Sequence, residues 1–459
     1  MSVFSLSNLK KTWYYLQKNG IRNAVWAVLE RIGQEQEVYT WQEPDEKTLS
    51  FQREHSASLR ISIVVPAYRT KKEHLEAMLN SVSKQSYPHW ELIVADAGGT
   101  AESVQAWAKK NGICLRKAAD TSNLAEWKDQ SIMLCTLSEN KGISANTNAG
   151  IELAAGDAVG LLDHDDLLTA NALWEMADCL EKEKKRGKQK LVLFSDEDKC
   201  DGAASRFSEP NFKPDFDGEL LLTNNYICHF TVIETVFLKE LKLRSGFDGA
   251  QDYDLVLRAY AAGGQFVHVP KVLYHWRCHE ASTASNPQSK RYAYEAGQRA
   301  LEDYCLRKGW KATVSGLKHL GFYREDYEDS VFCQRPEIGI WAKPLPGGRD
   351  IFGIRHPKGF LVSGLYENDG LMRYAGLRKG YSGPMHRAAL QQSAPAADLR
   401  SMEVCSALKE RYAQTIAELK EACQGLPTAA QETKILQKSM EFCKEATAAG
   451  YGILWDPQA

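Results

Sequence analysis

The sequence predicts an α/β protein in which helices cover both faces of a mainly parallel sheet. Short apolar runs alternate with amphipathic helical patterns from residue 61 to residue 194, which is typical of strand–helix–strand units. Three of these runs end at an aspartate, namely Asp96, Asp163 and Asp196. Ligands bind at the carboxyl ends of the strands in such sheets, so these positions predict one ligand crevice. Each aspartate alone would also suit a helix N-cap.

The individual elements follow from local patterns. Strands are expected at 61–66, 90–95, 132–137, 158–162, 191–194 and 266–269, where apolar and β-branched residues run together. Helices are expected around 75–82, 101–109, 143–155, 173–180 and 235–241, and from 253 through Arg258. An irregular, aromatic-rich stretch from 201 to 226 interrupts the alternation, and the sheet pattern resumes at 226–234.

The composition of the 459 residues is that of an ordinary globular protein, with 44% hydrophobic and 25% charged residues. A formal net charge of −2 gives no general basic field, which argues against a nucleic-acid partner. Eleven cysteines without a CxxC pair favour reduced thiols in a cytoplasmic setting. No apolar run approaches the roughly 18 residues that span a bilayer.

Residues 1–58 are expected to form an N-terminal extension with two short amphipathic helices broken near Gly20. The helices would pack on the main domain. Their interleaved aromatic and basic residues suggest the alternative, a peripheral contact with the inner face of the cell membrane.

The tail, 326–459, contains a hidden repeat of the segment that begins at Asp252. The alanines, glycine and proline of 252–270 recur at a constant offset of 187 positions, beginning at Ser439. This similarity favours a degenerate, partial second copy of the same unit. The alternative is chance, because a helix followed by glycine, strand and proline is a common pattern.

The segment Leu162–Asp166 reads Leu-Asp-His-Asp-Asp and follows an apolar run. Carboxylates crowded at the end of a strand repel one another unless a cation lies between them, and a divalent metal that also holds a diphosphate is the natural candidate. A second acidic motif, Gln251–Asp254, offers a candidate general base in Asp252. Asp252 could instead cap the helix that begins beside it.

Seven segments together resemble glycosyltransferase family 2, the inverting enzymes of the GT-A fold, and are most similar to the branch that builds bacterial O-antigens and related surface polysaccharides. They are Ser62–Tyr68, Tyr87–Asp96, Asn140–Gly150, Leu162–Asp166, Ser195–Lys199, Gly249–Leu255 and Leu273–Arg277. The resemblance covers 59–325, which we expect to be the transferase domain. Ala97 stands where the family often has a second aspartate, and the tail has no DxD motif, so we expect the tail to be non-catalytic.

The resemblance implies a nucleoside-diphosphate sugar as donor, linked to UDP or dTDP, with Mn²⁺ or Mg²⁺. Asp165 would coordinate the metal directly, and Asp163 would hold the ribose or support the metal shell. A late histidine often completes such a site, and His275 is the candidate, with His279 as its rival. The nucleotide-binding residues would be Pro66, Tyr68, Asp96, Asp163 and Lys141.

Asp252 would take the proton from an acceptor hydroxyl as that oxygen attacks the anomeric carbon. Gln251, Asp196 and Trp276 would line the acceptor side, although Asp196 could equally be a solvated loop carboxylate. The acceptor is expected to be a glycan or a polyprenol-linked glycan.

Two other functions remain as alternatives. A sugar-1-phosphate nucleotidylyltransferase would need a glycine-rich basic loop after the first strand, whereas Pro66–Lys71 contains no glycine. A non-catalytic scaffold or nucleotide-sugar-binding module suits the tail better than the main domain. No GxGxxG follows a strand, which argues against a Rossmann dehydrogenase.

Overall fold

The computed structural model describes residues 39–118, 128–278, 291–316, 320–342, 372–373, 402–422, 438 and 441–455. The two amphipathic helices predicted before residue 38, and His279, lie outside these ranges. No helix within the ranges is both long and apolar enough to cross a bilayer.

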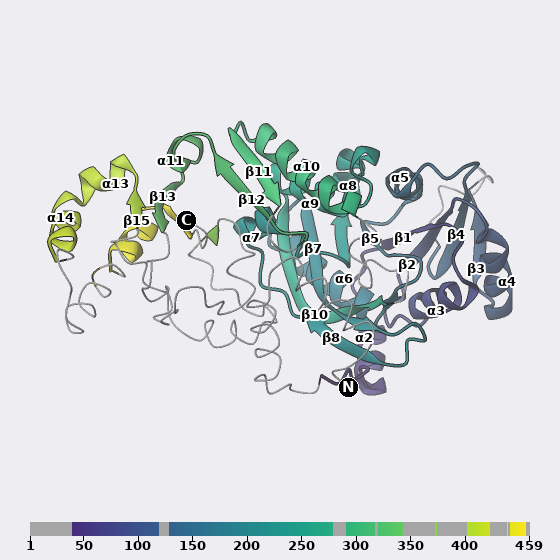
Figure 1. Ribbon diagram of the computed structural model, residues 1–459. Coiled ribbons are helices and arrows are strands. Elements are labelled where there is room, and N and C mark those ends of the chain that lie inside the picture. The colour runs from purple at the N-terminus through teal and green to yellow at the C-terminus, as the bar shows by residue number, and fades with distance from the viewer. Residues whose placement is uncertain are drawn as a thin grey trace, which may run out of the picture.

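A ten-stranded mixed sheet forms the centre of the molecule, in the order β3-β4-β2-β1-β5-β9-β7-β10-β6, with β8 paired to β7 (Figure 1). Its strands are β1 Ile61–Ala67, β2 Trp90–Asp96, β3 Cys114–Lys117, β4 Ser131–Thr136, β5 Ala158–Leu161, β6 Leu167–Leu168, β7 Leu191–Cys200, β8 Phe207–Asn211, β9 Thr231–Glu234 and β10 Gln265–Arg277. The prediction of a mainly parallel, helix-covered α/β fold is confirmed.

Helices cover both faces of this sheet. One apolar layer packs the strands against α3 Lys72–Ser83, α4 Ala101–Asn111 and α6 Ala172–Lys185. The opposite layer uses α5 Ile143–Leu153, α8 Thr235–Leu241 and α9 Gln251–Ala261. The strands of the parallel half are buried on both faces, which explains their continuous apolar sequences.

Strand β9 runs antiparallel between β5 and β7. In a parallel sheet every strand ends at the same edge, so an inserted antiparallel strand begins at that edge instead. The segment that precedes β9 is therefore delivered to the edge where β1 and β5 end. This placement brings residues 225–230 to the ligand crevice.

Several predicted elements differ from the structure: β10 continues beyond the predicted end at Val269 to Arg277, and β9 begins only at Thr231. Strand β7 does not end at Phe194 but continues through Asp196 to Cys200, because every carboxylate in its polar half has a partner: Lys213 for Glu197, His268 for Asp196 and His275 for Asp198. The stretch 201–226 is not uniformly irregular, since it contains β8 and the helix α7 Gly218–Thr223.

A second apolar cluster joins α7 and α9 to α10 Arg291–Arg307 and to the hairpin of β11 Ala312–Gly316 and β12 Tyr323–Tyr327. Strand β12 crosses the boundary predicted at 325/326. Beyond it, α11 Val331–Gln334 leads to Arg335, which makes a buried bidentate ion pair with Glu219 of α7 at 2.6 and 2.7 Å. The start of the tail is thus tied to the main domain.

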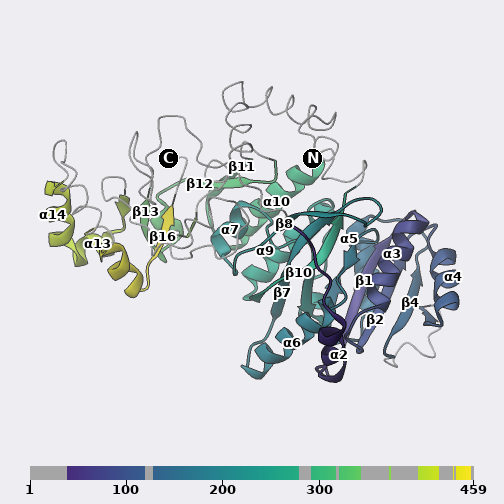
Figure 2. The ribbon, with the colours of Figure 1, turned by 90° about the horizontal axis from the view of Figure 1, so that it is seen from below.

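The described parts of the tail form a small sheet in the order β14-β16-β13-β15. They comprise β13 Ile338–Ala342, β14 Met372–Arg373, β15 Met402–Val404, β16 Gly452–Trp455, α13 Ser406–Arg411 and α14 Ala413–Ala422. Helices α13 and α14 lie at the opposite end of the molecule from α4 in both views (Figure 2). A helix over 441–448, Gly450 with positive φ and β16 succeed one another as α9, Gly263 and β10 do. The predicted second copy and the three-domain division stay predictions.

The described part of the N-terminal extension contains a helix, α2 Glu46–Glu54. Asp45 caps it by accepting from Thr48 N at 2.7 Å. Its buried Gln52 accepts from Ser86 and donates to Glu175 of α6. These contacts dock α2 on the main domain.

Candidate active site

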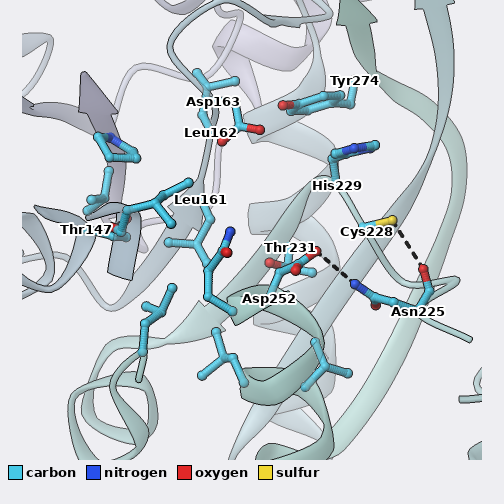
Figure 3. A pocket seen from close by; sticks show the side chains of 17 residues that line it. Thr147, Leu161, Leu162, Asp163, Asn225, Cys228, His229, Thr231, Asp252 and Tyr274 are labelled. Atoms are coloured by element: carbon cyan, nitrogen blue, oxygen red, sulfur yellow. Dashed lines mark hydrogen bonds between the residues drawn. The ribbon is translucent and has the colours of Figure 1, made fainter. Parts of the chain in front are cut away.

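A pocket lies where β1 and β5 end and β9 begins (Figure 3). Its cavity volume is about 70 Å³, and the space rises to about 650 Å³ when the open solvent at its mouth is included. The polar lining comes from five segments of the chain and comprises Asp163, Asn225, His229, Thr231, Gln251, Asp252, Thr147, Cys228 and Tyr274. Apolar residues of β1, β5, α5 and α9 form the remaining wall, including Pro66.

Asp163 and Asp166 of the acidic cluster after β5 have different surroundings. Asp166 is buried and accepts from Tyr274 Oη at 2.5 Å and from Arg277 N at 2.7 Å. It therefore fixes the cluster against β10. Asp163 faces the pocket. Burial and the negative charge of Asp165 raise the pKa of Asp163. A bound cation would relieve the repulsion between these two carboxylates.

Asp252 lies in the first turn of α9 and reaches the same pocket. Asn225 donates to its Oδ2 at 2.8 Å, as the dashed line in Figure 3 shows. Burial raises the pKa of Asp252, while the nearby His229 and the bond from Asn225 oppose that rise. A carboxylate that is held in place and has a raised pKa suits a general base.

His229 is held by a buried ion-pair chain that runs from Lys213 through Glu197. Glu197 Oε2 accepts from His229 N at 2.6 Å, from His229 Nδ1 at 2.9 Å and from Lys213 Nζ at 3.2 Å. Burial alone would lower the pKa of His229, but the charge and hydrogen bond of Glu197 raise it to about 9. Lys213 and His229 in turn lower the pKa of Glu197 to about 2 against the effect of its burial. Glu197 therefore stabilises the protonated form of the His229 imidazole.

Glu197, Cys228 and His229 place three possible metal-ligand atoms within 4.8 Å of one another. The glutamate oxygen already faces the buried ammonium of Lys213, whose side chain is 0% exposed. A second cation there would meet strong repulsion in a low-dielectric setting. We therefore interpret this cluster as an ion-pair network. Asp163 and Asp165 offer the hard oxygen ligands that Mg²⁺ and Mn²⁺ prefer.

The residues predicted to bind the nucleotide lie along one edge of the sheet. Asp96 is buried and accepts from Gly98 N at 3.1 Å and from Ala101 N at 2.9 Å, so it holds the turn into α4. Tyr68 is 39% exposed and lies beside Gly98. Lys141 is exposed, and its Nζ lies 3.1 Å from Glu139 Oε1. Of this group, only Pro66 and Asp163 line the pocket.

The residues predicted for the acceptor side do not all line the pocket. Gln251 lines the pocket, and its Oε1 accepts from Gly249 N at 2.8 Å. Trp276 packs against His229, with ring centroids 4.6 Å apart. Asp196 does not line the pocket, because its Oδ1 accepts from Lys213 N and His268 Nε2, both at 2.8 Å.

His275 comes directly after the pocket residue Tyr274 in β10, so the two side chains point to opposite faces of the strand. His275 Nδ1 bonds Asp198, and Trp41 and Phe207 enclose the ring. Its buried Nε2 has no hydrogen-bond partner among the described residues. A carboxylate that orients an imidazole in this way is the usual support of a metal-bound histidine. His275 remains a candidate ligand that lies outside the pocket.

The sequence interpretation missed Asn225, Cys228, His229 and Thr231. They precede or begin a short antiparallel strand, and the rule that ligands meet carboxyl ends of strands does not select such residues. Glu197 was seen only as part of an acidic motif, and Lys213 had no local pattern. A signal was present in the polar residues Asn225 and His229 beside the apolar start of β9, but it did not specify a site.

Part of this chain is similar to known proteins. The model of glycosyl transferase family 2 matches residues 62–240, which include the acidic cluster, Glu197 and His229. Residues 62–240 belong to glycosyltransferase family 2. The family 2 region thus contains β1 to β9 and most of the pocket, while Asp252 lies just beyond the matched residues.

Three relatives illustrate the extent of this likeness. An uncharacterized protein of Sinorhizobium fredii is 36% identical over 55% of this chain and 26% of its own length. The O-antigen biosynthesis protein RfbC of Myxococcus xanthus is 34% identical over 56% of this chain and 19% of RfbC. The amylovoran biosynthesis glycosyltransferase AmsB of Erwinia amylovora is 28% identical over 47% of this chain and 70% of AmsB. The chain matches only about a quarter or less of the first two proteins.

Among solved structures, that of S. aureus TarS residues 1–349 with UDP is 19% identical and covers 54% of this chain and 66% of that chain, with a TM-score of 0.39.

Proposed function

We propose that this protein transfers a sugar, with inversion, from a nucleoside-diphosphate sugar to a hydroxyl of a glycan or lipid-linked glycan. One observation carries the proposal. Asp163 and Asp252, which are distant in the sequence, face one pocket at the edge of the sheet. The acidic motif after β5 and the candidate base at the start of α9 are therefore placed for a donor to lie between them.

Asp252 acts as the general base in this proposal. It takes the proton from the acceptor hydroxyl as the hydroxyl oxygen forms a bond to the anomeric carbon. The bond from that carbon to the diphosphate breaks, and its electron pair leaves with the diphosphate. One displacement inverts the configuration. Asn225 donates to Oδ2 of Asp252 and so helps to orient the carboxylate that accepts the proton.

The donor diphosphate lies against Asp163 and Asp165 in this proposal. These two residues would hold Mn²⁺ or Mg²⁺, which supplies positive charge to the leaving diphosphate when bound. The nucleoside extends toward Tyr68 and Asp96. The exposed ring of Tyr68 offers an apolar surface for a base, and the backbone turn beside it is narrow because Gly98 and Gly99 have no side chain.

The product is a surface polysaccharide in this proposal. RfbC and AmsB carry the names of O-antigen and amylovoran biosynthesis. A lipid-linked acceptor fits the name of Escherichia coli WfgD, a glucosyltransferase acting on a diphosphoundecaprenol-linked sugar, which is 30% identical over 25% of this chain. Peripheral membrane contact through the N-terminal helices, on the cytoplasmic side, belongs to the same proposal.

Asp252→Asn tests the central role. Wild-type protein and variant are assayed with UDP- and dTDP-sugars and a polyprenol-linked glycan acceptor, and UDP and dTDP binding is measured by titration calorimetry. We expect the rate of transfer to fall by about 10²–10⁴ because the base is lost, with nucleotide affinity nearly unchanged. EDTA should stop wild-type transfer, and Mn²⁺ or Mg²⁺ should restore it.

Asp326→Asn is the matched control, because Asp326 is an exposed carboxylate of β12 outside the pocket. Normal turnover by Asp252→Asn would refute the assignment of the base. Full activity in EDTA would remove the metal from the proposal.

A further inference from the structure

His229 enters the pocket, and among the described residues only one of its ring nitrogens has a hydrogen-bond partner. Its Nδ1 is bound to Glu197 at 2.9 Å. No described residue makes a hydrogen bond with its Nε2, and the side chain is 20% exposed. Figure 3 shows the ring on the pocket wall beside Tyr274, with Asp163 on one side and Asp252 on the other.

The orientation of the imidazole is fixed from several directions. Tyr274 stacks on the ring with centroids 5.5 Å apart and planes 7° from parallel, and Trp276 packs at 4.6 Å. The same carboxylate oxygen that binds Nδ1 also accepts from the backbone N of His229 at 2.6 Å. The ring therefore has little freedom to turn, and Nε2 keeps its direction before any ligand arrives.

Burying the charged groups that hold His229 costs desolvation free energy. Lys213 is fully buried, and its Nζ bonds Glu197 Oε2 and the carbonyl oxygen of Ile227, both at 3.2 Å, as well as the carbonyl oxygen of Cys228. A buried ion pair contributes little net stability, because desolvation offsets the attraction. Such a chain is better explained by what it positions than by the stability that it adds.

We propose that His229 is a sugar-binding residue whose Nε2 donates a hydrogen bond to an oxygen of the transferred sugar. The inference rests on the proposed function, because the sugar lies between the diphosphate at Asp163 and the base at Asp252. His229 lies on the pocket wall between these two carboxylates. The ring oxygen and hydroxyls of a sugar bound between them would face this wall. The positive charge of the imidazolium makes it a stronger donor than a neutral amide.

Two substitutions separate this role from a structural one. His229→Asn keeps an amide nitrogen near the place of Nδ1, so it can still bond Glu197, but it leaves nothing at the place of Nε2. His229→Gln can place an amide nitrogen near Nε2 but loses the bond to Glu197. His89→Asn is the matched control, because His89 lies on the surface before β2 with its Nδ1 3.1 Å from Asp129 Oδ2.

The affinities of the full chain for UDP and dTDP are compared with those for UDP-glucose, UDP-N-acetylglucosamine and dTDP-rhamnose, with Mn²⁺ present. We expect His229→Asn to bind the free diphosphates as the wild type does. Its affinity for the nucleotide sugar that the wild type prefers should fall about tenfold to a hundredfold, the range for one lost hydrogen bond to a charged donor. His229→Gln should recover part of that loss, because a neutral amide donates a weaker hydrogen bond than the imidazolium, and the same order should appear in kcat/KM.

Equal affinity of wild type and His229→Asn for that nucleotide sugar would overturn the inference. A lower affinity of His229→Gln than of His229→Asn would overturn it as well, because it would indicate that only the bond to Glu197 matters. A wild-type protein that binds the diphosphates but gains nothing from any of the three sugars would also overturn it, while leaving the nucleotide site intact. Failure of the wild type to bind either diphosphate would instead refute the proposed function itself.

Discussion

Asp252 and Asp254 stand two residues apart at the start of α9, and the fold gives them different surroundings. Asp252 faces the pocket, and Asn225 donates a hydrogen bond to its carboxylate. Asp254 is 1% exposed and lies on the other side of the helix, where it accepts from Arg244 and Arg258. Arg258 also donates to the carbonyl oxygens of Leu241 and Lys242. Asp254 therefore holds α9 against the end of α8, and Asp252 is left for the ligand.

Asp254→Asn should destabilise the protein without a direct effect on chemistry. The substitution leaves two guanidinium groups facing a neutral amide, and breaking a buried pair typically costs about 3–5 kcal/mol. Urea unfolding followed by tryptophan fluorescence measures the change. Asp303→Asn is the matched control, since Asp303 pairs with Arg244 and Arg307 but its side chain is 26% exposed. The control should lose about 1 kcal/mol or less. Equal losses would contradict the structural role of Asp254.

At the scale of elements, the sequence predicted the parallel half of the sheet well. Strands β1, β2, β4 and β5 are continuous apolar runs because both of their faces are buried, and short runs of this kind between helical patterns are typical of parallel strands. The acidic cluster and Asp252 were also readable, since each lies at the end or the beginning of a strongly patterned element. Their convergence in one pocket required the topology.

The sequence did not predict the half of the site that depends on side-chain partners far away along the chain. The second half of β7 reads as a polar loop, because local pattern carries no information about Lys213, His229 or His268. Those partners satisfy Asp196 and Glu197 and let the strand continue. The same contacts place His229, so the residue could be found only once the antiparallel position of β9 was known.

The start of α5 depends on one glycine. Gly142 has φ of +95°, and a Cβ there would collide with Oδ2 of Asp248. Asp248 caps the helix by accepting from Ser144 N at 3.2 Å. The first turns of α5 supply Ile143 and Thr147 to the pocket wall. The need for glycine at position 142 therefore helps to determine the shape of the pocket.

Gly142→Ala should destabilise the protein by about 2–4 kcal/mol. Backbone strain at positive φ contributes about 1–3 kcal/mol, and loss of the cap about 1 kcal/mol. Gly112→Ala is the control, because Gly112 ends α4 with φ of +65° and nothing lies within 4 Å of its Cβ position. It should lose only about 1–2 kcal/mol. Chemical denaturation of both variants measures the difference, and a Gly142 variant no weaker than the control would disprove the steric conflict.

For the whole molecule, the second apolar cluster lies within the main domain, beside the ion pair that ties the start of the tail to it. It packs α7, α9 and α10 against the β11–β12 hairpin, and the pair of Arg335 with Glu219 closes it on the tail side. Glu325 points into this region from β12, is 1% exposed, and neither carboxylate oxygen has a hydrogen-bond partner among the described residues. Burial, reinforced by the negative charge of Glu219, raises the pKa of Glu325 to about 8, and Arg335 and Arg324 only partly oppose this.

The free energy of unfolding should therefore fall as the pH rises from about 4.5 to 8. In this window the glutamate ionises in the unfolded chain but stays protonated in the folded protein, so the folded state binds more protons. The loss is about 1.4 kcal/mol per pH unit. Above about pH 8 the group is ionised in both states and the loss stops growing. Glu325→Gln cannot ionise, so its stability relative to the wild type should increase steadily between about pH 5 and 8 and level off beyond.

Urea unfolding at half-unit pH steps measures this difference, and comparison with the wild type cancels the contributions of Asp163, Asp252 and the other groups common to both proteins. Glu328→Gln provides the control, because Glu328 is an exposed residue directly after β12. Its stability should match that of the wild type at every pH. A constant difference between Glu325→Gln and the wild type across the range would show that Glu325 ionises in the folded protein as it does in the unfolded chain. The buried carboxyl would then not link the stability of the molecule to pH.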